Sequence, residues 1–382
     1  MKKAVVKKSK SKTTVAKKIV RGMKSAISRA IGKKKPALNV KAKAKTKTGL
    51  SVLTRKKFNP IIAPNKNNYW EAWQTFNPGV ILLDDKVHFV YRAIGTDGIS
   101  RLGYAASTDG FTIDERHDAP CYQHPDQSNP FNFYSYFSGG GWGGSEDPRL
   151  TLIEEDGRVY MLYVALDGLP QLAITSISKK DFLNKVWNWK KPSIISPPNT
   201  IVKSGVLFPE KINGKYAILY RIFPDIWIDY VDSLDFEEGE HLKGSPAIQI
   251  RTDFWDSRKI GAGATPLKTK DGWLLIYYGV DDKDSGKYQM GAMLLDLKAP
   301  TKVLYRTSQP IIGPDEWYEN IGHKRGIIYP TGAVIKGKNL FVYYGGADSY
   351  VCVASASLHE FIRELKHQKT LHLTIKKITS KK

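Results

Sequence analysis

Five stretches of the chain share one pattern of apolar and polar positions. In each, a short apolar strand meets a tight turn rich in Gly, Asn or Asp, and a β-branched and aromatic strand, a polar loop and another strand follow. The turns lie at 84–86, 156–157, 213–214, 271–272 and 336–337, so the pattern recurs every 57–71 residues. The first strands are predicted at 77–83, 147–153, 207–212, 263–268 and 331–335. The turn residues suit the positive φ angles that hairpins need.

Five antiparallel units in series predict an all-β fold. A unit of three or four strands cannot bury both of its faces alone, and such units bury them by packing one after another around an axis. A β-solenoid would need a much shorter repeat. We therefore predict a five-bladed β-propeller over residues 58–365, followed by one helix over 358–368.

The positive charge of the chain is concentrated at its two ends. The formal net charge is +22, from 59 basic and 37 acidic residues. Residues 1–57 hold 21 Lys and Arg and no acidic residue, and residues 366–382 hold six Lys, also without an acidic residue. The remaining 32 basic and 37 acidic residues give the middle of the chain about −5. We expect both ends to be disordered basic tails, because dense like charges repel and little apolar surface offsets chain entropy.

The basic N-terminal tail allows two further interpretations. Val15, Ile19, Met23 and Ile27 would share one face of a helix, which could bind an anionic membrane or direct the protein to an organelle. The tail could equally contact nucleic acid or another polyanion through phosphate groups. Apart from such targeting, we expect an intracellular, cytoplasmic protein.

Several classes of protein are excluded by composition and motifs. No apolar run approaches the roughly 20 residues of a membrane-spanning helix. Two cysteines, Cys121 and Cys352, cannot form a disulfide framework or a Cys-rich zinc site. The chain has no HExxH, P-loop or nucleophile-elbow motif. We therefore expect neither a metal nor another cofactor.

Carboxylate, cationic and aromatic residues recur where the first strand of a unit begins and where the second ends. In a propeller these positions converge on one mouth of the central channel. Asp147, in the run Glu146-Asp-Pro-Arg149, is one such residue, and a strand-entry turn is its simplest structural explanation. Together the positions suit a polyhydroxylated ligand, because charged groups bind hydroxyls and aromatic rings pack against sugar C–H surfaces.

Taken in order, these segments resemble glycoside hydrolase family 130, inverting enzymes that act on β-mannosides, many of them phosphorylases. The resemblance covers about 58–365. The runs that carry it are Phe76-Asn-Pro-Gly79, Tyr91-Arg-Ala93, Ser100-Arg101, Glu146-Asp-Pro-Arg149, Leu207-Phe-Pro-Glu-Lys211, Asp225-Ile-Trp-Ile228, Ser257-Arg-Lys-Ile-Gly-Ala-Gly263 and Tyr343-Tyr-Gly-Gly-Ala-Asp348. It implies that Asp147 is the general acid, protonating the glycosidic oxygen through the mannosyl 3-hydroxyl. It also implies sugar binding by Asn77, Arg92, Arg101 and Asp348, and a cationic acceptor side with Arg149, Lys211 and Arg221.

The sequence departs from the family pattern at two positions. Gln171 stands where relatives have a phosphate-binding Arg, and Tyr220 stands where they have a phosphate-contacting His. Each lost charge-assisted hydrogen bond is worth about 1.5–3 kcal/mol, so phosphate affinity should fall by roughly two orders of magnitude. These departures favour hydrolysis.

Three functions remain open at this stage: hydrolysis of β-mannosides, phosphorolysis with inorganic phosphate as co-substrate and mannose 1-phosphate as product, and non-catalytic binding of sugars. The substrate is a mannoside or manno-oligosaccharide in each case. Hydrolysis would require a general base to activate water. The candidates are Asp167, Asp225, Asp281 and Asp282.

Overall fold

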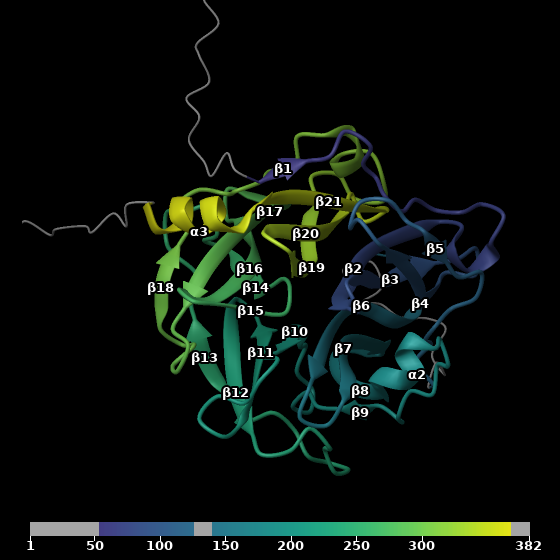
Figure 1. Ribbon diagram of the computed structural model, residues 1–382, viewed down its shortest axis with the longest axis horizontal. Helices are drawn as coiled ribbons and strands as arrows, with labels where there is room; N and C mark the ends of the chain where they lie inside the picture. Colours follow the sequence, from purple (N-terminus) through teal and green to yellow (C-terminus); the bar gives the residue numbers. More distant parts are fainter. Residues whose placement is uncertain (1–52, 126–139, 368–382) are drawn as a thin grey trace, which may run out of the picture. The chain divides into compact units, whose positions relative to one another are not determined.

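The computed structural model describes residues 53–125 and 140–367, which form β-strands in antiparallel groups with few helices (Figure 1). The predicted all-β class is confirmed. The proposed amphipathic helix near residue 20, and the tails up to residue 52 and from residue 368, lie outside the described residues. No described helix is long and apolar enough to cross a membrane.

The first two groups share one eight-stranded sheet. The first group contains β2 (Gln74–Leu83), β3 (Lys86–Ile94), β4 (Ile99–Ser107) and β5 (Glu115–Arg116). The second contains β6 (Gly143–Ile153), β7 (Arg158–Asp167), β8 (Leu169–Ser178) and β9 (Ser193–Ile194), with helix α2 (Lys179–Leu183) after β8. β4 and β6 pair in parallel at two positions, Ile99 with Gly143 and Ser100 with Gly144, and this pairing joins the two antiparallel groups.

Three separate sheets make up the rest of the fold. The third group is β10 (Lys203–Leu207), β11 (Tyr216–Ile222), β12 (Asp225–Val231) and β13 (Ser245–Ile248). The fourth is β14 (Lys259–Ala262), β15 (Leu267–Thr269), β16 (Gly272–Asp281), β17 (Asp284–Leu295) and β18 (Val303–Arg306). The fifth is β19 (Ile328–Lys336), β20 (Asn339–Gly346) and β21 (Tyr350–Ser357), with β1 (Thr54–Arg55) paired to β21.

The short helices lie between or after these groups. The 3₁₀ turns η1 (Tyr69–Glu71) and η3 (Trp317–Glu319) precede β2 and β19. Helix α3 (Leu358–His367) follows β21, where the sequence predicts a helix over 358–368. Its apolar residues Phe361, Ile362 and Leu365 pack with Leu53 in one hydrophobic cluster, so both ends of the described fold meet there.

The predicted hairpin turns are confirmed, whereas two predicted first strands are displaced. In the third group the first strand is β10, which ends at Leu207, and not 207–212. In the fourth group the predicted strand 263–268 falls between β14 and β15. The cause is cross-strand pairing of charged and small residues, such as Lys203 opposite Arg221, which an apolar pattern does not reveal.

Four of the hydrophobic clusters each join two consecutive groups. One cluster combines residues of the first and second groups, and others join the second to the third, the third to the fourth and the fourth to the fifth. A further cluster packs Val80 and Phe89 of the first group with Phe341 and Tyr343 of the fifth. The last group of the chain therefore packs against the first. In Figure 1 the first strands β2, β6, β10, β14 and β19 lie toward the middle of the view.

The first strands approach one another so closely that side chains cannot be accommodated at some contacts. A Cβ atom added at Gly79 of β2 would lie 2.6 Å from the carbonyl oxygen of Pro148 in β6. Glycine is therefore required by close backbone approach, since Gly79 has no positive φ angle.

We predict that Gly79→Ala destabilises the protein by about 1–3 kcal/mol, because backbone must move to relieve the overlap. Urea unfolding followed by tryptophan fluorescence measures the change. Gly313→Ala is the matched control, since its added Cβ would lie no closer than 3.4 Å to a neighbouring atom. Equal stability of the two variants would contradict the prediction.

Candidate active site

Four of the first strands carry a β-bulge where they approach one another. The strand register shifts between Phe76 and Gly79, Glu146 and Arg149, Lys203 and Val206, and Pro330 and Gly332. Residues within these bulges are Asn77, Asp147, Ser204 and Thr331. The first three have φ angles of 47°, 49° and 58°, in the left-handed region. A non-glycine residue pays about 1–3 kcal/mol for such a conformation, and this strain is concentrated at functional sites.

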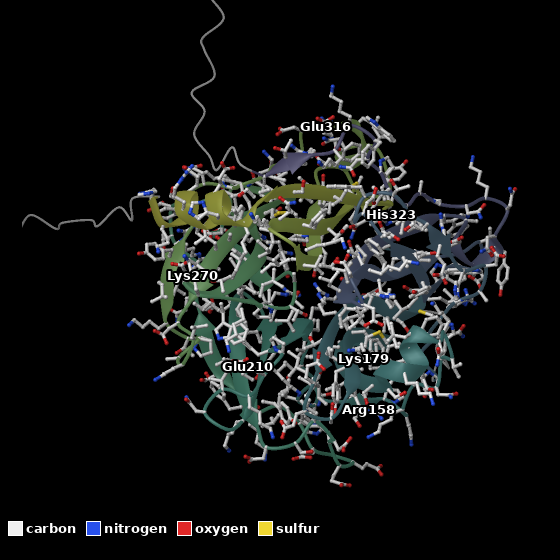
Figure 2. All side chains as sticks on the ribbon, viewed as in Figure 1. Arg158, Lys179, Glu210, Lys270, Glu316 and His323 are labelled. Carbon is white, nitrogen blue, oxygen red and sulfur yellow. The ribbon has the colours of Figure 1, made fainter. Side chains whose placement is uncertain are left out.

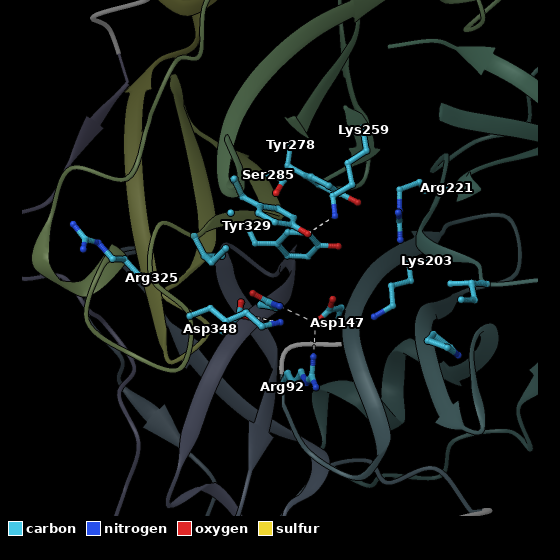
Figure 3. A pocket seen from close by; sticks show the side chains of 17 residues that line it. Arg92, Asp147, Lys203, Arg221, Lys259, Tyr278, Ser285, Arg325, Tyr329 and Asp348 are labelled. Atoms are coloured by element: carbon cyan, nitrogen blue, oxygen red, sulfur yellow. Dashed lines mark hydrogen bonds and ion pairs between the residues drawn. The ribbon is translucent and has the colours of Figure 1, made fainter. Parts of the chain in front are cut away.

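A cavity of about 510 Å³ lies at these bulges (Figure 3). Its lining contains two carboxylates, six cationic side chains and three tyrosines, from every group of strands. The lining residues are Asn77, Arg92, Asp147, Pro170, Ile201, Lys203, Arg221, Lys259, Tyr278, Ser285, Gly286, Tyr288, Lys324, Arg325, Ile327, Tyr329 and Asp348. The excess of four positive charges makes the cavity attractive to an anion.

Asp147 is buried in the wall of this cavity, with 5% of its surface exposed. Its Oδ1 accepts a hydrogen bond of 2.8 Å from Asn77 Nδ2 and lies 3.4 Å from Arg92 Nη1. Burial acts to raise the pKa of Asp147, but the charges of Arg92, Arg149 and Lys203 outweigh it. The pKa therefore lies below its ordinary value, and the carboxylate is ionised at neutral pH.

Three of the four predicted sugar-binding residues line the cavity with Asp147. Asn77 and Arg92 contact Asp147, and the Asn77 Oδ1 atom is buried without a hydrogen-bond partner among the described residues. Asp348 lies beside Lys324, 3.6 Å away, and its burial raises its pKa despite that charge. A buried polar atom without a partner and a carboxylate of raised pKa are suited to bind hydroxyl groups.

Arg101, the fourth predicted sugar-binding residue, does not line the cavity. Its guanidinium pairs with Asp97 at 2.6 Å and hydrogen-bonds Gln123 at 2.9 Å. It also stacks over the ring of Tyr69, which is 62% exposed.

A cluster of three cations lines one side of the cavity. Lys203 of β10 lies opposite Arg221 of β11. The charges of both contribute to lowering the pKa of Lys259 of β14. In Figure 3 Lys203 and Arg221 lie to the right of Asp147 and Asp348 lies to the left, with Lys259 above Asp147. Lys203 pairs with Glu146 at 3.2 Å. Among the described residues, neither Arg221 nor Lys259 pairs with a carboxylate, and the Arg221 Nε atom is buried without a hydrogen-bond partner.

Lys259 is the most perturbed cation of the cluster. Burial, followed by the charges of Arg221 and Lys203, lowers its pKa to about 7. Its Nζ lies 2.5 Å from the hydroxyl of Tyr288, a third tyrosine next to Tyr278 and Tyr329. The amine is therefore poised to gain a proton when an anion enters.

Of the predicted acceptor-side residues, only Arg221 lines the cavity. Arg149 is buried behind it, where it donates to the Asp147 carbonyl at 2.6 Å and to the Tyr329 hydroxyl at 3.4 Å. Gln171, on β8 opposite Ala165, is not among the lining residues.

Tyr220 and Lys211 face away from the cavity. Tyr220 is buried in the hydrophobic cluster between the second and third groups and packs near Trp227. Lys211 pairs at 2.9 Å with Glu155, whose side chain is 61% exposed. The neighbouring Glu210, labelled in Figure 2, pairs with the exposed Lys268.

Sequence reasoning missed Lys203 and Lys259 as site residues, whereas it predicted aromatic residues at the mouth, where Tyr278 and Tyr329 line the cavity. Lys203 was missed because the first strand of the third group was predicted to begin at residue 207, four residues after the start of β10. A signal for it existed, since Lys203-Ser-Gly205 precedes an apolar strand much as Asn77-Pro-Gly79 does. Lys259 lies in the run 257–263, which resembles the family pattern, but that resemblance assigned no role to this lysine.

The general-base candidates are not assembled at the cavity. Asp225 accepts a hydrogen bond from the Ile250 amide, and Asp282 pairs with Arg258 at 3.5 Å. Asp281 accepts from Ser257, and none of these three lines the cavity. The Asp167 side chain lies outside the described side chains.

Comparison with known proteins identifies the family. Residues 43–367 match the profile of a family described as β-1,4-mannooligosaccharide phosphorylase, glycoside hydrolase family 130. The chain belongs to glycoside hydrolase family 130. It is therefore a glycoside-processing enzyme, and the resemblance noted in the sequence is confirmed.

Members of family 130 similar to this chain include phosphorylases and a structure linked to hydrolases. A 1,2-β-oligomannan phosphorylase from Thermoanaerobacter sp. (strain X514) is 36% identical over 311 residues, covering 79% of this chain and 96% of the relative. The β-1,2-mannobiose phosphorylase of Listeria innocua, solved with β-1,2-mannobiose, is 25% identical with a TM-score of 0.66, covering 82% of this chain and 99% of that one. Another solved structure comes from work on family 130 glycoside hydrolases that target β-1,2 mannosidic linkages in Candida mannan. It is 25% identical with a TM-score of 0.67, covering 83% of this chain and 96% of that one.

We predict that Lys259 makes the stability of this family 130 protein rise with pH above neutrality. Its folded pKa of about 7 lies below the ordinary value near 10.4, so between these pH values the unfolded chain binds more protons. The stability of the wild type relative to Lys259→Met should rise by about 1–3 kcal/mol from pH 7 to pH 9.5.

Urea unfolding at both pH values measures this difference. Lys215→Met is the control, because Lys215 pairs with Asp232 at the exposed surface. A wild-type advantage that stays constant with pH would show that Lys259 is charged in the folded protein.

Proposed function

We propose that the protein is an inverting β-mannoside phosphorylase with Asp147 as general acid. The observation that carries this proposal is the cation cluster of Lys203, Arg221 and Lys259 at one side of the cavity. A neutral sugar has no need of such charge, whereas a phosphate dianion does. The relative named 1,2-β-oligomannan phosphorylase supports the same reaction.

In this reaction the glycosidic oxygen leaves the mannosyl C1 atom with a proton from Asp147, delivered through the 3-hydroxyl of the sugar. A phosphate oxygen forms the new bond to C1 from the opposite face, so a β-mannoside yields α-mannose 1-phosphate. Asn77, Arg92 and Asp348 hold the mannosyl unit. The cation cluster holds the phosphate and stabilises the charge that develops during the attack.

Phosphate binding also prepares the acid. The surrounding cations hold the pKa of Asp147 low, which favours the ionised form over the proton donor. A dianion placed among Lys203, Arg221 and Lys259 offsets part of this positive charge. The pKa of Asp147 then rises, and the carboxyl group can carry the proton that it donates.

We further propose that the five strand groups are the blades of a five-bladed β-propeller around this cavity. The cluster that packs the fifth group against the first supports closure. The pairing of β1 with β21 supports it too, because a strand from the start of the chain then completes the last blade. A closed arrangement explains how every group contributes to one cavity.

Hydrolysis is the second candidate function. It is favoured by Asp348, a second carboxylate that lines the cavity and whose pKa is raised by burial. In this alternative a water molecule takes the place of phosphate. The structural neighbour linked to family 130 hydrolases makes the alternative concrete.

The acceptor assay separates the two reactions. β-1,2- and β-1,4-linked mannobiose and manno-oligosaccharides are incubated with and without inorganic phosphate, and the products are identified by NMR. We expect α-mannose 1-phosphate, formed only when phosphate is present. Asp147→Asn should lower kcat by about 10²–10⁴-fold. Free mannose formed equally well without phosphate would establish hydrolysis, and an Asp147→Asn variant of full activity would reject the acid.

We predict that Lys203→Met raises the KM for phosphate about 10–100-fold, because one charge-assisted hydrogen bond to the anion is lost. Tyr220→Phe is the comparison variant and should change this KM less than twofold, since its ring packs in a hydrophobic cluster. Initial rates at varied phosphate concentration give both values. A larger effect at Tyr220 than at Lys203 would move the phosphate site away from the cation cluster.

A further inference from the structure

The carboxylate of Glu146 lies fully buried between two cations of the cavity. It has no exposed surface, and its Oε1 lies 2.8 Å from Arg92 Nη2 while its Oε2 lies 3.2 Å from Lys203 Nζ. It precedes the general acid in the chain, and it does not itself line the cavity. The reaction proposed above assigns no role to it.

The two partners of Glu146 belong to different halves of the site. Arg92 contacts the Asp147 carboxylate through Nη1 and is further held by Ser100 and the Gly140 carbonyl. Lys203 belongs to the cation cluster on the other side. Glu146 thus pairs at once with Arg92, beside the proposed sugar-binding residues, and with Lys203, in the cation cluster.

The charge of Lys203 acts on two carboxylates. It pairs with Glu146, and it also lowers the pKa of Asp147. The other groups that act on Asp147 come from four elements and the loop after β20: Asn77, Arg92, Arg149, Tyr329 and Asp348. If Glu146 lost its charge, the charges of Arg92 and Lys203 would act more strongly on Asp147, which would hold that carboxylate ionised.

We propose that Glu146 is a positioning residue that holds Lys203 on the acceptor side and keeps its charge from locking the general acid in the ionised form. The inference rests on the proposed function. Glu146 offsets the charges of Arg92 and Lys203, so that Asp147 can change its protonation state during turnover.

The test compares Glu146→Gln with wild type by three measurements. The first is the pH profile of phosphate-dependent kcat, and the second is calorimetric binding of sulfate, a dianion that cannot react. The third is urea stability. Glu155→Gln is the control, because it removes a carboxylate paired with Lys211 on the outer surface. Glu146→Asp retains the charge and tests rescue.

The proposal predicts that Glu146→Gln lowers kcat but does not lower the affinity for sulfate. In Glu146→Gln the alkaline limb of the kcat profile should move about one pH unit lower, and kcat at pH 8 should fall about tenfold. Sulfate should bind as tightly as to wild type or more tightly, because the site gains net positive charge. Glu146→Asp should keep the wild-type limb. Adding Lys203→Met to Glu146→Gln should return the limb toward that of wild type.

A merely structural role gives a different result. If Glu146→Gln lowers kcat and sulfate affinity together while the alkaline limb stays in place, the proposal is overturned. If Glu146→Gln does not fold, Lys203→Met decides by itself. Removing this cation must move the alkaline limb to higher pH, and an unmoved limb overturns the proposal.

Wild-type protein that binds no sulfate and shows no phosphate-dependent turnover overturns the proposed function itself. An unmoved limb in a sulfate-binding enzyme overturns only the role of Glu146.

Discussion

The close approach of the first strands is the constraint on which this structure depends. Where β2 meets β6, the Gly79 backbone lies so near the Pro148 carbonyl that no side chain fits between them. Strands that meet this closely cannot all keep a regular ladder, and four of them bulge at the contact. The bulges turn Asn77, Asp147 and Ser204 into left-handed conformations. Tight packing and the functional site are therefore two results of the same geometry.

The charge distribution of the cavity follows from this arrangement. Each of the four bulged first strands brings one or two polar residues to its bulge, and the strand paired with it adds others, as Arg221 does beside Lys203. Cations from β10, β11 and β14 line the cavity together with Asp147 and Asp348. Such a concentration of like charge is costly inside a protein unless a ligand balances it. Burial, together with the charges of Arg221 and Lys203, lowers the pKa of Lys259, so this amine loses its proton more readily than an exposed lysine.

The same charge balance separates substrate binding from proton transfer. A general acid must be able to carry a proton near neutral pH, whereas an anion site must remain cationic. When both lie within one small cavity, each disturbs the other. Glu146, buried between Arg92 and Lys203, gives the permanent cations a permanent partner. In the proposed reaction, Asp147 and Lys259 are then the groups whose protonation changes when phosphate binds.

Much of the fold, and the candidate acid Asp147, could be predicted from the sequence, because they depend on local pattern. The five turns follow from Gly, Asn and Asp between apolar runs, and the strand class follows from alternation. Asp147 stood out through its motif and its resemblance to family 130. The acceptor side could not be read in the same way. Whether Lys203 or Lys211 reaches the cavity depends on the register between β10 and β11, which places Lys203 opposite Arg221 and Lys211 at the outer surface. Tyr220 and Arg221 are neighbours in sequence, yet strand alternation sends one into a hydrophobic cluster and the other into the cavity. The sequence by itself determined the repeats and singled out Asp147, whereas tertiary packing alone decided which cations surround it, because register and bulges are set by contacts between strands far apart in the chain.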